Sequence, residues 1–451
     1  MENQKTNLAR EVSGLIDQKK YGKVKDILPF HPEDIAHLIS ELNLSSYKLF
    51  VFRLVPYEKA VDVFEHLPVE EEEQILTGLN SNEIKEILNE MSPDDRTELF
   101  DELPAELAKK FINFLSAQKR QVAIELLNYP HDSVGRLITP DFVQLFEGML
   151  VKDALAHIRS VGLRKETVYH CYVLDSSKKL IGIVSLKKIV LAKPDTKIGQ
   201  IMSKDVISVS AFTDKEEAAD VFKRYDLIVL PVLDNNNKLL GIVTFDDLVD
   251  VLEEETTEDF EKAAAVLPVD KPYMDASFFD LLWKRSFWLI VLVVLESTSS
   301  LVIKSYGPLI QKWIALTFFL PILIATGGNA GIQSAMMITR SLTIKDISVK
   351  DFFKVIFRES LLGLSIGFIL ALVGIARVLL QEGNQWALSV SVGVSMGITV
   401  LFSAMIGAAL PMIFRKLKLD PALMSGPLIT TIVDVCGVFI YFQIAAAILG
   451  L

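Results

Sequence analysis

The sequence predicts a multidomain protein with an all-α helical superhelix, an α/β tandem repeat and an α-helical transmembrane domain with five spans per chain. Three observations support this. Short helical segments separated by Leu-Pro pairs fill the first part, a strand–turn–strand–helix pattern then occurs twice, and the composition becomes strongly apolar near residue 276. We expect domains at 1–135 (helical, sensing), 136–252 (tandem repeat), 253–277 (acidic connecting helix) and 278–451 (membrane pore).

The N-terminal region carries an internal repeat of helix starts. HPEDIAHLISEL at 31–42 echoes SPDDRTELFDEL at 92–103. In each segment a proline is followed by carboxylates, which suits the first turn of a helix because the N-terminal end of the helix dipole is positive. The pattern predicts a stacked array of short helices. Its carboxylates, Asp94 and Asp95 among them, can bind cations or simply face water.

The next region contains two copies of a longer unit. CYVLDSSKKLIGIVSLKKI begins at Cys171 and LPVLDNNNKLLGIVTFDDL begins at Leu230, an offset of 230 − 171 = 59 residues. Each copy reads as a strand, an Asp-containing turn, a second strand and a helix start. The region resembles a tandem pair of CBS domains. The resemblance implies a regulatory module that dimerises and often holds an adenine nucleotide such as ATP.

The two copies differ where a nucleotide would bind. The second copy keeps the pattern G-I-V-T-x-x-D, so Thr244 and Asp247 can contact a ribose through a hydroxyl and a carboxylate at a helix start. The first copy has Ser185 and Lys188 at these places. We therefore expect at most one nucleotide site per pair, and the alternative is an empty cleft filled by side chains.

Charge separates the chain into two parts. Beyond residue 276 there are 13 Lys and Arg and 8 Asp and Glu, a net of +5, and the earlier part has 33 against 49, a net of −16; the sum is −11. An acidic surface disfavours nucleic acid as a partner and favours divalent cations. The apolar part contains five segments long enough to span a membrane: Ser286–Ile303, Trp313–Ile338, Ser360–Leu380, Trp386–Phe414 and Ala422–Leu451.

Basic loops predict the orientation of these spans. The loop between the second and third spans carries five Lys or Arg from Arg340 to Arg358, and the loop between the fourth and fifth carries Arg415, Lys416 and Lys418. By the positive-inside rule both loops lie on the cytoplasmic side. We expect a multi-pass protein of the cytoplasmic membrane with its N-terminus inside and its C-terminus outside.

Polar residues inside the spans are candidates for an ion site. Asp434 lies about 18 Å along its helix, and a charge at that depth costs on the order of 2.5 to 3.5 kcal/mol. The stretch PILIATGGNAGIQ of the second span offers close backbone approach at Gly328 and amide oxygens on Asn329 and Gln333. Several neutral oxygens around one carboxylate suit a hard cation. The alternatives are a buried hydrogen bond for Asp434 and simple close packing for the glycines. Glu296, in the cluster ESTSS, can equally hold helices together.

The membrane stretches PxxxxxGGNxGxQ and PALxxGPxxTTxxD, with the order of domains, resemble the MgtE family of magnesium channels and transporters. This resemblance covers essentially the whole chain. It implies a homodimer with ten spans around one pore, cytoplasmic domains that sense magnesium, and a connecting helix that plugs the pore when magnesium is plentiful. The family's pore aspartate corresponds to Asp434, so two copies would hold Mg²⁺ through its waters.

Regulation is expected to use the acidic surfaces, because Mg²⁺ bound between facing carboxylates turns repulsion into cross-linking. Any single acid can still be only a solvated surface residue. The candidate regulatory ligands are Asp94, Asp95, Glu216, Glu217, Asp246, Asp247, Asp250, Glu254, Glu255, Glu258 and Asp259.

Three other functions stay open. An ion-coupled carrier of divalent cations would use the same membrane motifs, and a membrane-anchored nucleotide sensor would move no ion. An enzyme is disfavoured because the sequence shows no nucleophile with a base partner, no P-loop and no zinc-type cluster.

Overall fold

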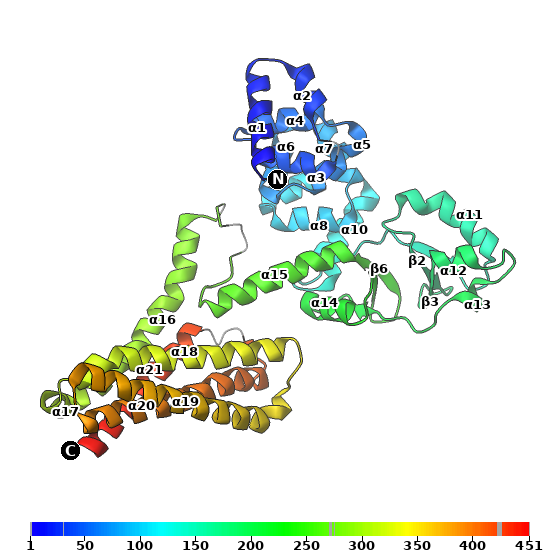
Figure 1. Cartoon of the computed structure of the whole chain (residues 1–451). Helices are drawn as coiled ribbons and strands as arrows, with labels where there is room; N and C mark the ends of the chain where they lie inside the picture. The colour runs from blue at the N-terminus through cyan, green and yellow to red at the C-terminus, as the bar shows by residue number, and fades with distance from the viewer. Residues whose placement is uncertain (1, 30, 270–272, 275, 422–425, 451) are drawn as a thin grey trace. The chain divides into compact units, whose positions relative to one another are not determined.

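A computed structural model describes residues 2–29, 31–269, 273–274, 276–421 and 426–450. The chain forms two compact units, Met1–Glu253 and Glu254–Leu451, which are described separately (Figure 1). The first unit contains the helical array and the tandem repeat. The second contains the end of the connecting helix and the five long apolar helices.

Among the described residues, ten short helices build the N-terminal part of the first unit. Their lengths, 7 to 16 residues, are marginal for isolated helices, so packing must stabilise them. Both α3 and α8 begin with proline in the first turn followed by two carboxylates, which confirms the predicted internal repeat. The helices are α1 (Glu2–Asp17), α2 (Tyr21–Ile27), α3 (Pro32–Ser40), α4 (Ser45–Leu54), α5 (Tyr57–Glu65), α6 (Val69–Gly78), α7 (Ser81–Glu90), α8 (Pro93–Glu102), α9 (Ala105–Ile112) and α10 (Ala117–Leu127).

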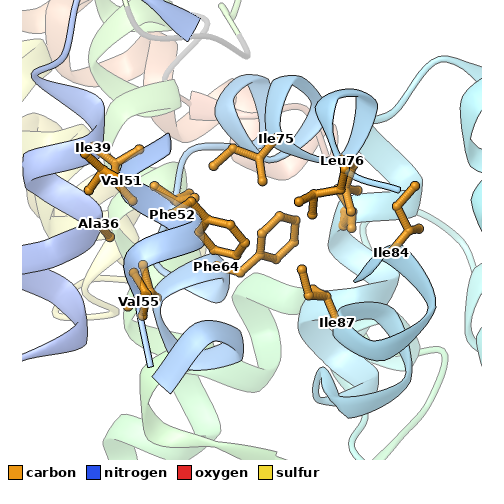
Figure 2. Packing of buried hydrophobic residues seen from close by; sticks show 14 of the residues in the cluster. Ala36, Ile39, Val51, Phe52, Val55, Phe64, Ile75, Leu76, Ile84 and Ile87 are labelled. Carbon is orange, nitrogen blue, oxygen red and sulfur yellow. The ribbon is translucent and has the colours of Figure 1, made fainter. Parts of the chain in front are cut away.

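The apolar faces of these helices share one core (Figure 2). Phe52 of α4 packs edge-on against Phe64 of α5, with ring centroids 6.0 Å apart. Ile75 of α6 and Ile84 and Ile87 of α7 extend the same core and are also buried. Each helix contributes only a few apolar side chains, so the array is stable because neighbouring helices complete the core.

In the described ranges, two three-stranded sheets form the tandem repeat, and both have the same order. In each sheet the first and second strands are parallel and the second and third are antiparallel. The strands are β1 (Val143–Phe146), β2 (His170–Leu174), β3 (Leu180–Ser185), β4 (Val209–Ser210), β5 (Val229–Leu233) and β6 (Leu239–Thr244). The helical segments are η1 (Val134–Leu137), α11 (Val151–Val161), η2 (Gly162–Arg164), α12 (Leu186–Leu191), α13 (Ile198–Ile201), α14 (Lys215–Arg224) and α15 (Phe245–Ala263).

The turns within the two copies are equivalent. Asp175 Oδ1 accepts hydrogen bonds from the backbone N–H groups two and four residues further on, and Asp234 Oδ1 does the same. The two aspartates are 234 − 175 = 59 residues apart, which is the offset of the sequence repeat. The predicted strand–turn–strand–helix order is therefore confirmed in both copies.

Within the part of the second unit that the structure describes, five helices are long and apolar enough to cross a membrane, as the sequence predicts. The fifth begins at Gly426 in the structure, and Ala422–Ser425 and Leu451 of the predicted span lie outside the described residues. The unit contains α16 (Phe278–Ser305), α17 (Gly307–Lys312), α18 (Leu316–Thr343), η3 (Val349–Asp351), α19 (Phe352–Glu382), α20 (Trp386–Lys416) and α21 (Gly426–Leu449).

Close backbone contact holds α18, α19 and α20 together. A Cβ atom on Gly407 of α20 would lie 2.3 Å from the carbonyl oxygen of Gly331 in α18. One on Gly367 of α19 would lie 2.5 Å from the carbonyl oxygen of Gly397 in α20. No side chain fits at these distances, so glycine at these contacts permits the packing of the bundle.

Candidate functional site

Two of the intramembrane candidates, Gly328 and Asp434, meet where α18 faces α21. A Cβ atom on Gly328 would lie 3.8 Å from Asp434 Oδ1 and 3.1 Å from Thr430 Cγ2, so the glycine leaves room for the carboxylate. Asp434 Oδ1 is buried and has no hydrogen-bond partner among the residues that the structure describes. The alternative of a helix-packing hydrogen bond at this oxygen is therefore not what the structure shows. An acceptor left unpaired in an apolar bundle is a suitable ligand for a cation.

Asn329 and Gln333 lie elsewhere on α18. They are one turn apart, and both are exposed, whereas Gly327, Gly328 and Gly331 are buried against neighbouring helices. The structure therefore does not bring these two amides onto Asp434 within one chain. An amide facing lipid has no hydrogen-bond partner, so this exposed stripe is favourable only if protein or water covers it.

Four of the predicted regulatory acids come together from distant parts of the sequence. Asp94 and Asp95 at the start of α8 lie within electrostatic reach of Asp246 and Asp247 at the start of α15. We call this group, with Glu65, Glu72 and Glu166, the acidic cluster. Its carboxylates are close enough to disfavour one another's ionisation.

Burial is the largest cause of the raised pKa values in this cluster, which are those of Glu65, Glu72, Asp94, Asp95, Glu166 and Asp247. Burial and the charge of Glu98 raise the pKa of Glu72 to about 9, and burial with the charge of Asp95 raises the pKa of Glu65 to about 8. Burial also raises the pKa of Asp94, whose Oδ1 has no hydrogen-bond partner in the described ranges. A bound divalent ion would favour the ionised forms, so the cluster is chemically suited to bind one.

Arg96 supplies a partial counter-charge inside the cluster. Its side chain is 1% exposed, and Nη1 donates to the carbonyl oxygens of Leu88 and Met91 at 3.3 and 3.0 Å. The guanidinium lies near Asp94 and Glu65, which partly offset the effect of burial on its pKa. One guanidinium cannot pair with all seven carboxyl groups, so each further group that ionises adds negative charge that Arg96 does not balance.

The cluster is not a preformed cage. Across the described ranges, no three His, Cys, Asp or Glu side chains are arranged to hold one metal ion. Mg²⁺ keeps most of its waters and often uses only one or two carboxylates directly. Loose spacing therefore fits a hydrated ion better than a fully dehydrated one.

The cluster predicts how stability depends on pH. The raised pKa values mean that the folded chain binds protons more tightly than the unfolded chain does. The resulting contribution to the free energy of unfolding is fully present below about pH 4.5 and is lost as the pH rises through 7 to 9. In EDTA, the free energy of unfolding of the first unit, obtained from urea unfolding, should fall by about 2 to 4 kcal/mol between pH 6 and 9. Trypsin cleavage within residues 1–253 against urea concentration measures this. Magnesium and Glu72→Gln should each reduce the pH dependence, and an unchanged slope in both cases would contradict the assignment.

Other predicted regulatory acids lie outside this cluster. Glu216 and Glu217 are exposed in the first turn of α14, and Asp250 and Glu254 are exposed on α15. The structure of one chain shows no shared metal geometry for these acids within its described part.

The end of α15 carries a separate network. Lys262 Nζ lies 2.8 Å from Glu258 Oε1 and 2.8 Å from Asp420 Oδ2, in the segment before α21. Burial opposes the charge on Lys262, but hydrogen bonds to Asp420 and Glu258 raise its pKa. Burial and the charge of Asp420 raise the pKa of Asp259. Glu258 thus already has a fixed positive partner, which the sequence analysis did not anticipate.

The nucleotide candidates lie at the junction of β6 and α15. Asp247 Oδ2 accepts hydrogen bonds from the backbone N–H and Oγ1 of Thr244, at 3.1 and 2.6 Å. In the first copy the equivalent junction is closed differently, with Ser185 Oγ accepting from the Lys188 N–H. Burial, opposed by the two hydrogen bonds from Thr244, raises the pKa of Asp247 to about 7. The same carboxyl group thus belongs to both the nucleotide candidate and the acidic cluster.

Several acids are buried in the structure although their local sequence indicates an exposed position. Glu72 lies within the run VEEEEQ, which reads as a solvated surface, yet it is 4% exposed. Its position three and four residues before the buried Ile75 and Leu76 was the available signal. Glu359 of α19 is also buried and accepts a 2.7 Å hydrogen bond from Ser334 Oγ of α18.

Comparison with known proteins agrees with this arrangement. The family described as "Divalent cation transporter" matches residues 320–444, the MgtE intracellular N domain matches 30–132, and CBS domains match 134–195 and 198–254. "Magnesium transporter MgtE" of Thermus thermophilus is 37% identical over 422 residues, 93% of each chain. That of Bacillus subtilis is 34% identical over 336 residues, 74% of each chain.

Solved structures resemble the first unit. The cytosolic domain of the Mg²⁺ channel MgtE in complex with ATP is 33% identical, with a TM-score of 0.51, and the match covers 54% of this chain and 99% of that one. The soluble part of a magnesium transporter is 25% identical with a TM-score of 0.51, covering 56% and 99%.

Five helices that can cross a membrane, joined to a CBS pair and a helical N-terminal domain, place the chain among the multi-pass membrane transporters. The matched relatives are named as transporters, which agrees with the expectation that the chain is not an enzyme. The chain belongs to the MgtE family of magnesium transporters.

Proposed function

We propose that the chain forms a magnesium-selective channel in the cytoplasmic membrane, in which Asp434 lines the pore and Mg²⁺ bound to acidic cytoplasmic residues closes it. The observation that carries the proposal is the unpaired Asp434 oxygen beside Gly328. A carboxylate in a membrane helix is costly without a function. Because Mg²⁺ dehydrates reluctantly, one or two carboxylates around a largely hydrated ion suffice.

The exposed amides support a homodimer. A second copy placed against α18 would cover Asn329 and Gln333 and bring two Asp434 side chains toward one axis. Facing carboxylates repel unless a cation lies between them. The pore ion would then contribute to assembly, with Gly328, Asn329 and Gln333 offering neutral oxygens around it.

The acidic cluster and the end of α15 supply the proposed magnesium sensor. Residues 1–135 would act as the sensing domain, 136–252 as the CBS pair and 253–277 as the connecting plug. Buried, mutually repelling carboxyl groups gain most from a divalent ion, so magnesium should favour a compact cytoplasmic region. The basic loops favour a cytoplasmic N-terminus and an external C-terminus.

Magnesium flux into vesicles containing purified protein, with internal magnesium varied, tests the proposal. We expect uptake at low internal Mg²⁺ and closure at high internal Mg²⁺. Single-channel currents would support a channel, and flux that persists without such currents would indicate an ion-coupled carrier. Vesicles that take up no divalent ion would favour a membrane-anchored nucleotide sensor. The same assay with Co²⁺, Ni²⁺ and Mn²⁺ measures selectivity.

Nucleotide is a second proposed ligand. The relative noted above was solved with ATP, and the β6–α15 junction of this chain has a hydroxyl and a carboxylate suited to a ribose. We propose that one adenine nucleotide binds at Thr244 and Asp247. The hydrogen bond between these two side chains would have to open or be shared with the ribose.

Asp247→Ala should weaken ATP binding about 10- to 100-fold, since a hydrogen bond to a charged group contributes about 1.5 to 3 kcal/mol. Calorimetry on the purified chain measures this. Lys188→Ala, at the equivalent place of the first copy, is the matched control and should bind as the wild type does. Absence of ATP binding to the wild type would remove the proposal.

A further inference from the structure

A second acidic residue lies at the level of Asp434 in the membrane bundle. Glu296 is on α16, whose buried residues within the described chain are Leu292 and Ser299. These flank Glu296 four residues before and three residues after, so all three lie on the helix face that packs into the bundle. That face packs against α21, which carries Asp434.

The register of the two helices places the carboxylates at a similar depth. As first and fifth spans, α16 and α21 run in the same direction through the membrane. Tyr306, at the end of α16, stacks on Phe442 of α21 with ring centroids 5.1 Å apart, and Gln443 Nε2 donates to the Tyr306 hydroxyl at 2.6 Å. Going back from this contact at 1.5 Å per residue, Glu296 is about 15 Å away and Asp434 about 12 Å away.

A buried hydroxyl marks the same position. Ser299 is 7% exposed, and its Oγ has no hydrogen-bond partner within the described part of the chain. By contrast, the exposed Ser297 and Thr298 donate to the backbone carbonyls of Val293 and Leu295. Ser299 therefore differs from its neighbours in having an unused polar group on the bundle side.

We propose that Glu296, together with Ser299, forms part of the intramembrane cation site of Asp434 and sets its preference for highly charged ions. The inference rests on the proposed pore role of Asp434. Two carboxylates at one depth in an apolar bundle repel each other, and a divalent cation between them removes that repulsion. Ser299 offers a neutral oxygen to the ion or to one of its waters.

The proposal predicts an effect that scales with ion charge. Removing one negative charge weakens the attraction for an ion in proportion to the charge of that ion. Glu296→Gln should raise the Mg²⁺ concentration for half-maximal uptake about 10-fold, and should then weaken inhibition by hexaamminecobalt(III), a trivalent complex, about 30-fold. Uptake into vesicles holding the full-length protein at low internal Mg²⁺ measures both constants. Glu296→Asp, which keeps the charge, should stay close to wild type.

Ser297→Ala on the exposed face is the matched control and should change neither constant. Equal changes for both ions would show that Glu296 acts only through packing, and an unchanged Mg²⁺ dependence in Glu296→Gln would overturn the proposal. If Glu296→Gln does not assemble, Glu296→Asp tests the proposal in its place. A rise of about 10-fold in the half-maximal Mg²⁺ concentration of Glu296→Asp, which keeps the charge, would contradict the proposal. Asp434→Asn separates the proposed pore function from the role of Glu296. If Asp434→Asn transports Mg²⁺ normally, the proposed pore function fails. If Asp434→Asn loses transport while Glu296→Gln transports as the wild type does, only the role of Glu296 is refuted.

Discussion

Asp434→Ala is expected to reduce magnesium uptake at least about 100-fold while leaving the protein folded. A carboxylate 4 Å from a unit charge contributes about 4 kcal/mol at an effective dielectric of 20, and the attraction is larger for a divalent ion. The substitution also removes an unpaired buried oxygen, which relieves a desolvation cost rather than adding one. The measurement is Mg²⁺ uptake into vesicles with low internal magnesium, beside the elution volume and melting temperature of the purified variant.

Two variants of the same helix separate charge from shape. Asp434→Asn keeps the size of the side chain but not its charge, and it should be nearly as inactive as the alanine variant. Cys436→Ala changes a half-buried neighbour that carries no charge at neutral pH, and it should transport normally. Wild-type uptake by Asp434→Ala would show that the pore assignment is wrong.

Much of the fold follows from periodicity that each segment carries by itself. The 59-residue offset of the Asp turns, the proline starts of α3 and α8 and the five apolar stretches are local patterns, and the structure confirms them. Each depends on contacts between residues close in sequence or on the average composition of a segment. Such features survive in a single sequence because no distant partner is needed to define them.

The candidate sites depend on partners that sequence does not specify. Lys262 and Asp420 are 158 positions apart, and no local pattern couples them. The approach of Asp94 on α8 to within electrostatic reach of Asp247 on α15 likewise depends on the tertiary fold, because the two residues are far apart in the sequence. Asn329 and Gln333 are the reverse case. Their shared motif predicted one site with Asp434, but the geometry of the helix places them on another side of α18.

The triple variant Glu255→Gln, Glu258→Gln, Asp259→Asn is expected to keep magnesium uptake high at internal concentrations that close the wild-type protein. Moving a gate from 1:99 to 99:1 requires about 5.5 kcal/mol of differential binding, which several weak sites can share. Losing about 1.4 kcal/mol of that total would raise the closing concentration about tenfold if a single ion were involved. Uptake against internal Mg²⁺, with protease protection of residues 1–253 read in parallel, measures this shift.

Because Lys262 already pairs with acids in this region, the direction in which the closing Mg²⁺ concentration shifts is informative. In the wild type it already neutralises part of the charge on Glu258 and Asp420, so magnesium has only the remaining negative charge to bridge. Neutralising the three acids relieves repulsion, which by itself would favour closure, but it also removes the ligands that draw the divalent ion in. A divalent ion that lies between two carboxylates is attracted to them more strongly than they repel each other. Loss of the ligands should therefore dominate, and the gate should stay open.

A control variant loses the same charge at exposed positions of the helical array, through Glu33→Gln, Glu41→Gln and Glu58→Gln. It should close near the wild-type Mg²⁺ concentration. If the triple variant of α15 instead closes and compacts as the wild type does, these acids are solvated surface residues and the closing ions bind elsewhere.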